Sequence, residues 1–98
     1  MTPEAKVKAK VKRILDKINC YYFFPATGGY GRSGVPDVIV CFKGHFIGIE
    51  CKAGKGTLTA LQANELKKIE FNEGSVCVIN EHNIDELEEW LWNEVQSQ

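Results

Sequence analysis

Two short apolar runs on either side of Lys43-Gly44 constrain the fold of this 98-residue chain more than any other feature. The runs cover residues 38–42 and 46–49, and most of their residues are β-branched or aromatic, as strands favour. Lys43-Gly44 is a natural turn between two such runs. The sequence therefore predicts a β-hairpin with strands over about residues 37–42 and 45–52.

Charged residues stand at the open end of this hairpin. If the hairpin is centred on Lys43-Gly44, residues pair when their numbers sum to 87, so that Asp37 lies opposite Glu50. Cross-strand neighbours have Cβ atoms about 4.5–5.5 Å apart, and like charges there repel each other. A divalent cation would offset this repulsion, so the register predicts a metal site. A three-residue loop that included His45 would shift the sum to 88 and stagger the two acids.

Two more charged side chains are expected near this pair. Lys52 follows Glu50 by two residues, so both share one face of a strand. Glu4 precedes Val7 by three residues and is in register with the apolar stripe of the first helix, so it points inward. Carboxylate oxygens suit Mg²⁺ or Mn²⁺. Simpler interpretations stay open, since Lys52 could form an ordinary ion pair and Glu4 could complement the helix dipole.

The rest of the chain alternates helices with strands and predicts one domain over residues 1–98. Thr2 and Thr59 are the expected N-caps of the first two helices, and Glu73-Gly74 marks the end of the second. The predicted order is αβββαβα. Outside the hairpin, the expected segments are a helix over 3–18, a strand over about 20–24, a helix from 60 to about 73, a strand over 75–79 and a helix over 84–95.

Composition excludes several classes of protein. No apolar run approaches the roughly 18–20 residues that span a membrane, and the lysine-rich start lacks the apolar stretch of a signal peptide. The cysteines form no CxxC pair and have no histidine at ligand spacing, so they indicate reduced thiols rather than a zinc site. We therefore expect a cytoplasmic protein. The four cysteines are Cys20, Cys41, Cys51 and Cys77.

Charge is divided unevenly along the chain. Residues 1–55 carry ten Lys and Arg against four Asp and Glu, whereas residues 56–98 carry two against nine. This asymmetry favours a polyanion partner on one face, although two oppositely charged surface helices would give the same composition. The polar side of the first helix carries a basic stripe formed by Lys6, Lys10, Arg13 and Lys17.

An aromatic run, residues 21–24, follows the first helix. Two tyrosines and two phenylalanines in succession exceed what one face of a small domain can bury. We therefore expect the protein to associate with itself through this region.

The order of the charged motifs resembles a known group of enzymes. An Asp at the head of one strand and Glu-x-Lys on the next, within an αβββαβ order, resemble the PD-(D/E)xK nuclease superfamily. The glycine-rich segment 28–34, which runs directly into Val35-Pro36-Asp37, is more narrowly similar to a stand-alone VRR-NUC domain, found in bacteriophages and at the end of a larger eukaryotic repair nuclease. The resemblance spans residues 4–80. It implies an α/β, restriction-endonuclease-like fold with a mixed sheet flanked by helices, followed here by a C-terminal helix.

The resemblance also implies roles for individual residues. Asp37, Glu50 and the backbone carbonyl of Cys51 would ligate the metal, and Lys52 would be the catalytic lysine. Glu4 matches the acid of the family's first helix, which would hold the metal directly or through a water molecule. Gln62 matches a glutamine that follows the catalytic strand in the family. Its catalytic role is implied by the resemblance alone, because its own position in the sequence is that of an ordinary helix residue. Thr59-Ala60 stands where such motifs often have a proline.

The implied activity is hydrolysis of DNA phosphodiester bonds by an Mg²⁺- or Mn²⁺-dependent endonuclease. The resemblance to this group also implies a homodimer that cuts four-way junctions or other branched DNA. If a phage encodes the protein, it would act in the host cytoplasm. The competing hypotheses are a nucleic-acid-binding or assembly module without catalysis, and a structural domain with charged surface residues. Arg32 and Tyr30 are the preferred DNA contacts because their loop leads into Asp37, and Lys55 and the basic stripe of the first helix are further candidates.

Overall fold

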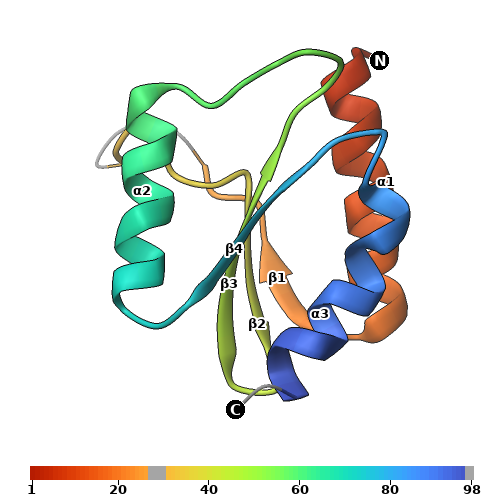
Figure 1. Ribbon diagram of the computed structural model, residues 1–98. Helices are drawn as coiled ribbons and strands as arrows, with labels where there is room; N and C mark the ends of the chain where they lie inside the picture. The colour runs from red at the N-terminus through yellow and green to blue at the C-terminus, as the bar shows by residue number, and fades with distance from the viewer. Residues whose placement is uncertain (27–30, 97–98) are drawn as a thin grey trace.

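The predicted hairpin forms the centre of a four-stranded sheet (Figure 1). The computed structural model describes residues 1–26 and 31–96. Strand β2 (Val38–Phe42) is joined to strand β3 (His45–Cys51) by Lys43 and Gly44, whose φ angles are 53° and 81°. Positive φ at both positions is the geometry of the tightest hairpin turn. Val38 pairs with Ile49, which confirms the two-residue turn and the sum of 87.

The outer strands complete a mixed sheet, as predicted. Strand β1 (Tyr21–Phe23) is antiparallel to β2, and strand β4 (Ser75–Ile79) is parallel to β3, in the order β1-β2-β3-β4. Strand β1 is shorter than the predicted 20–24, because only its three residues pair with β2. Phe24 precedes Pro25, which has no N–H to donate to a neighbouring strand.

Three helices cover the sheet (Figure 1). Helices α1 (Pro3–Ile18) and α3 (Leu87–Gln96) lie side by side on one face, and α2 (Ala60–Phe71) lies on the other. The order αβββαβα is confirmed, with a 3₁₀ turn at Ile84–Glu86 where the sequence predicted the first turn of the last helix. None of the helices in the described part of the chain is both long and apolar enough to cross a membrane.

The end of α2 differs from the prediction, and the difference explains why a glycine stands at position 74. The helix ends at Phe71 with Asn72 as its C-cap, and Glu73, not Gly74, adopts a positive φ of 68°. A Cβ on Gly74 would lie 2.7 Å from Ile69 Cγ2, so crowding against α2, not left-handed backbone, requires glycine here.

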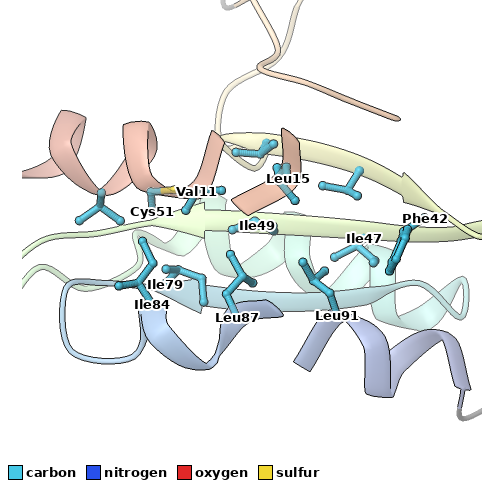
Figure 2. Close-up of a cluster of buried hydrophobic side chains, with 13 residues drawn as sticks. Val11, Leu15, Phe42, Ile47, Ile49, Cys51, Ile79, Ile84, Leu87 and Leu91 are labelled. Atoms are coloured by element: carbon cyan, nitrogen blue, oxygen red, sulfur yellow. The ribbon is translucent and has the colours of Figure 1, made fainter. Parts of the chain in front are cut away.

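Strand alternation divides the hairpin into two faces. Val38 and Val40 on β2, and Ile47 and Ile49 on β3, are fully buried against α1 and α3. Each such side chain contributes about 1.5–3 kcal/mol by leaving water. Figure 2 shows the side chains of β3, α1 and α3 meeting in this layer. The helices contribute Val7, Val11, Leu15, Leu87 and Leu91.

The opposite face of the sheet packs against α2 over only part of its area. At Gly48 a Cβ would come within 2.8 Å of Ile69 Cδ1, so glycine lets α2 approach β3 closely. Beyond α2, large apolar side chains of β1 and β3 stay exposed on this face, since Tyr21, Phe23 and Phe46 are 70%, 47% and 48% exposed. We call these three residues the outer aromatic face. By alternation, Asp37 and Glu50 also belong to the side of the sheet that carries α2.

Candidate active site

The two acids predicted to face each other lie at the end of the hairpin farthest from its turn. Asp37 immediately precedes β2, and Glu50 is the second-last residue of β3. Continuing the register of Val38 and Ile49 by one residue sets Asp37 opposite Glu50. The Cys51 backbone N–H donates a hydrogen bond to Asp37 Oδ2 over 2.7 Å, which fixes the carboxylate against the end of β3.

Glu50 is buried without enough partners for a charged group. Glu50 is only 2% exposed, and its Oε2 has no hydrogen-bond partner among the residues that the structure describes. Oε1 lies 3.5 Å from Gln62 Nε2, at the outer limit of a hydrogen bond. Burying a charged carboxylate in this way is costly, so its charge must be removed by a proton or balanced by a cation.

Protonation divides the pair into one neutral and one charged group. Burial, followed by the neighbouring Asp37 carboxylate, raises the pKa of Glu50 to about 8. Burial alone would raise the pKa of Asp37 too, but interactions with Glu50, the Cys51 N–H and Lys8 lower it below its usual value. Near neutral pH the site therefore carries its negative charge on Asp37 and its proton on Glu50.

Lys8 of α1 also belongs to the site, although it was not among the residues that the sequence pattern predicted there. Its Nζ lies 3.3 Å from Asp37 Oδ1. Burial opposes the charge of Lys8, but the attraction of Asp37 prevails and raises the pKa of the lysine. The sequence held part of the signal, because spacings of four residues from Glu4 and three from the buried Val11 place Lys8 on the inward side of α1 without identifying its partner.

Glu4 and Lys52 lie beside the two acids rather than between them. Both line an open hollow of about 540 Å³, together with residues from the start of α1 and from the loop after β3. Glu4 contributes to the raised pKa of Glu50, and Lys52 opposes it. Over residues 1–26 and 31–96, no three His, Cys, Asp or Glu side chains are grouped to hold a metal ion. Asp37 and Glu50 therefore form a pair of carboxylates, with Glu4 at its edge.

Gln62 has a structural role that connects helix α2 to the site. Thr59 Oγ1 accepts from the Gln62 N–H over 3.2 Å, and Gln62 Oε1 accepts from the Thr59 N–H over 2.9 Å. This reciprocal capping box leaves Nε2 directed toward Glu50. The sequence signal was the spacing of Thr59 and Gln62, which also explains how α2 begins without the proline that such motifs often have.

The predicted DNA contacts are distributed over several surfaces. Arg32 Nε pairs with Glu65 Oε1 of α2 at 3.0 Å, and Lys17 Nζ pairs with Glu88 Oε1 of α3 at 2.9 Å. Tyr30 lies outside the described residues. The exposed residues Lys6, Lys10 and Arg13 lie on α1, and the exposed Lys55 lies in the loop after β3.

The cysteines are all free. Burial raises the pKa of both Cys51 and Cys77 to about 12, so their thiols stay protonated and weakly reactive near neutral pH. Cys51 thus takes part in the site through its backbone.

Comparison with known proteins supports the fold. No family model matches the sequence, and no curated protein matches it closely enough to be counted as a relative. A solved structure described as a VRR_NUC domain is similar to this one with a TM-score of 0.74 and 20% sequence identity, over 91% of this chain and 97% of that chain. The chain therefore has the fold of a VRR_NUC domain, as the resemblance of its motifs predicted.

Proposed function

We propose that the protein is an endonuclease that hydrolyses DNA phosphodiester bonds with the help of Mg²⁺ or Mn²⁺. The observation that carries this proposal is the pairing of Asp37 with the buried Glu50 at the end of β3, in a fold shared with a VRR_NUC domain. Lys52 beside this pair completes the set of charged groups that the chemistry requires.

The donor atoms of the site fit a hard divalent cation. Two carboxylates and the Cys51 carbonyl are oxygen ligands, and Glu50 Oε2 is a buried oxygen that lacks a partner among the described residues. Water and DNA phosphate would supply the remaining ligands, with Glu4 acting through water from the edge of the hollow. When bound, such an ion supplies positive charge that polarises a phosphate and acidifies water.

The protein's own residues would then have distinct roles. Asp37 is fixed by the Cys51 N–H, and Glu50 gives up the proton that its burial otherwise retains. Gln62 Nε2 orients the Glu50 carboxylate from the first turn of α2. Lys52 stabilises the charge that develops on the phosphate in the transition state, or orients the attacking water.

DNA would approach the end of the sheet where α1 and α2 begin (Figure 1). Lys6, Lys10 and Arg13 on the exposed side of α1 would contact phosphates, and Lys55 would do so from the loop beside the hollow. Each phosphate that is neutralised steepens the salt dependence of binding. Arg32 can join them by leaving Glu65, since its side chain is 70% exposed.

We further propose that the enzyme is a homodimer selective for branched DNA, such as a four-way junction. The outer aromatic face supports this proposal, because a second copy would cover apolar side chains that α2 leaves open. Two active sites in one dimer would suit paired incisions across a junction.

The test is cleavage of labelled four-way junction, flap and linear duplex in Mg²⁺, Mn²⁺ or EDTA. The proposal predicts cutting in either metal, strongest on branched DNA, and none in EDTA. Cutting in EDTA would contradict the metal-dependent mechanism. Tight binding to junctions without cleavage in either metal would favour a non-catalytic DNA-binding module instead.

A further inference from the structure

Both oxygens of the Asp37 carboxylate are already occupied. Oδ2 accepts from the backbone N–H of Cys51 over 2.7 Å, and Oδ1 lies 3.3 Å from Lys8 Nζ. A cation that binds Asp37 must therefore displace one of these partners or share an oxygen with it. The Cys51 N–H belongs to β3, which pairs with both of its neighbouring strands, so it cannot move away without disrupting the sheet. Lys8 can, because its ammonium is on a flexible four-carbon stem.

We propose that Lys8 is the resident counter-ion of this site, which holds Asp37 Oδ1 in the metal-free protein and gives up that oxygen when a divalent cation binds. The inference rests on the proposed function, because it assumes that Asp37 is a metal ligand. Lys8 is in this account a positioning residue, which acts through Asp37.

The surroundings of Lys8 distinguish it from an ordinary surface lysine. The Lys8 and Asp37 side chains are 37% and 21% exposed, so water screens their attraction only in part. Val7 and Val11 on either side of Lys8 are buried in the core, so the helix holds the root of this side chain in place. Lys8 is therefore directed at Asp37 by the packing of α1 against the sheet.

Glu4 gives the ammonium a second position. It lies one helical turn before Lys8, and its charge already contributes to the raised pKa of the lysine. A divalent cation at Asp37 would repel the Lys8 ammonium, and a rotation of the side chain toward Glu4 would keep the ammonium paired. Exchange of Lys8 between Asp37 and Glu4 thus requires no movement of the backbone.

Calorimetric titration of Mn²⁺ into DNA-free protein tests the inference. Wild type is compared with Lys8→Met, which keeps the length and apolar stem of the side chain but removes its charge. Lys12→Met is the matched control. Lys12 is also on α1 and forms an ion pair, with its Nζ 3.2 Å from Asp16 Oδ2, but Asp16 is exposed and does not belong to the site. Lys8→Arg retains the charge and should restore the competition with the metal.

We expect Lys8→Met to bind Mn²⁺ about fivefold more tightly than wild type, because a partly exposed ion pair no longer competes with the metal. Its Tm without metal should fall, since Asp37 then loses the cation that pairs with its Oδ1. Lys12→Met and Lys8→Arg should keep the wild-type affinity. Equal or weaker binding by Lys8→Met would overturn the inference while leaving the proposed function intact. If wild type and Lys8→Met both fail to bind Mn²⁺, the metal-dependent function and the inference fail together.

Discussion

Glu50 shows how a single buried residue can conflict with the stability of a fold. Its carboxyl group is almost completely enclosed, and one oxygen lacks a partner among the described residues. A leucine of similar size would make the folded protein more stable at this position, because its burial removes no charge from water. The metal-free protein reduces the cost by keeping the proton, which makes stability depend on pH.

The raised pKa of Glu50 fixes the direction of that dependence. The unfolded chain loses the proton near pH 4.5, whereas the folded protein keeps it up to about pH 8. Between these values the unfolded state binds fewer protons, so the free energy of unfolding falls as pH rises. The lowered pKa of Asp37 has its effect only in acid. We expect the metal-free Tm to decrease from pH 5 to pH 8.5 by about 5 °C or more.

Glu50→Gln removes the titrating group and should flatten this slope. Scanning calorimetry in EDTA at several pH values measures both proteins under the same conditions. An unchanged slope in Glu50→Gln would show that another group causes the pH dependence. A wild-type Tm that rises with pH over this range would show that Glu50 is ionised in the folded protein.

Asp37 and Glu50 could be located from the sequence because the hairpin register depends on local signals. Lys43-Gly44 specifies the turn, and the turn fixes every pair along both strands. Lys8 could not be located in this way, because its partner is on another element and the contact depends on how α1 packs. The pattern of α1 shows which side is buried but not which strand it faces.

At the scale of elements, helix α2 both supports the sheet and contributes to the site. Its first turn is held by the capping box of Thr59 and Gln62, and the same glutamine reaches Glu50. Gly48 and Gly74 allow Ile69 of this helix to lie close against the sheet. The position of Gln62 is therefore set by a cap whose sequence signal is purely local.

Substitutions at the two capping residues separate the structural role of Gln62 from its role in the site. Thr59→Ala and Gln62→Ala should each lower the free energy of unfolding by about 1 kcal/mol, because each removes a capping bond. Only Gln62→Ala should also slow DNA cleavage. Urea unfolding and cleavage rates measure the two effects. Equal losses of activity in both variants would show that Gln62 acts only through the start of the helix.

The boundaries that the sequence placed wrongly are those decided by packing or by pairing. Strand β1 ends at Phe23, the last of its residues that pairs with β2, and the last helix opens with a 3₁₀ turn that buries Ile84 in the core. The interiors of the elements were predictable because apolar periodicity is strong there. Their ends depend on neighbours that a single segment does not reveal.

At the scale of the whole molecule, the uneven charge of the sequence is partly neutralised on one face. The basic helix α1 and the acidic helix α3 lie side by side (Figure 1), and Lys17 of α1 pairs with Glu88 of α3. The two oppositely charged surface helices that the sequence allowed are therefore present, and the polyanion partner stays a prediction. On α1, Lys17 is thus paired with an acidic side chain of α3, whereas Lys6, Lys10 and Arg13 are exposed along the helix.

The open part of the sheet gives a prediction about assembly. Replacing Phe23 with Glu would place a charge on the outer aromatic face, and we expect the variant to be a monomer where wild type is a dimer. Phe71→Glu is the control, since Phe71 is 86% exposed at the end of α2 and is not one of the three residues of this face. Sedimentation velocity distinguishes the two states. A dimer that persists in Phe23→Glu would place the interface elsewhere.

The central claim, that Asp37, Glu50 and Lys52 form a nuclease active site, is tested most directly by the cleavage rate of Lys52→Ala. On the branched DNA that wild type cuts best, in Mg²⁺, we expect a loss of about 10²–10⁴-fold with DNA binding and Tm nearly unchanged. Lys67→Ala, which removes an exposed lysine of α2, should cut at the wild-type rate. Retention of wild-type cleavage by Lys52→Ala would contradict the account.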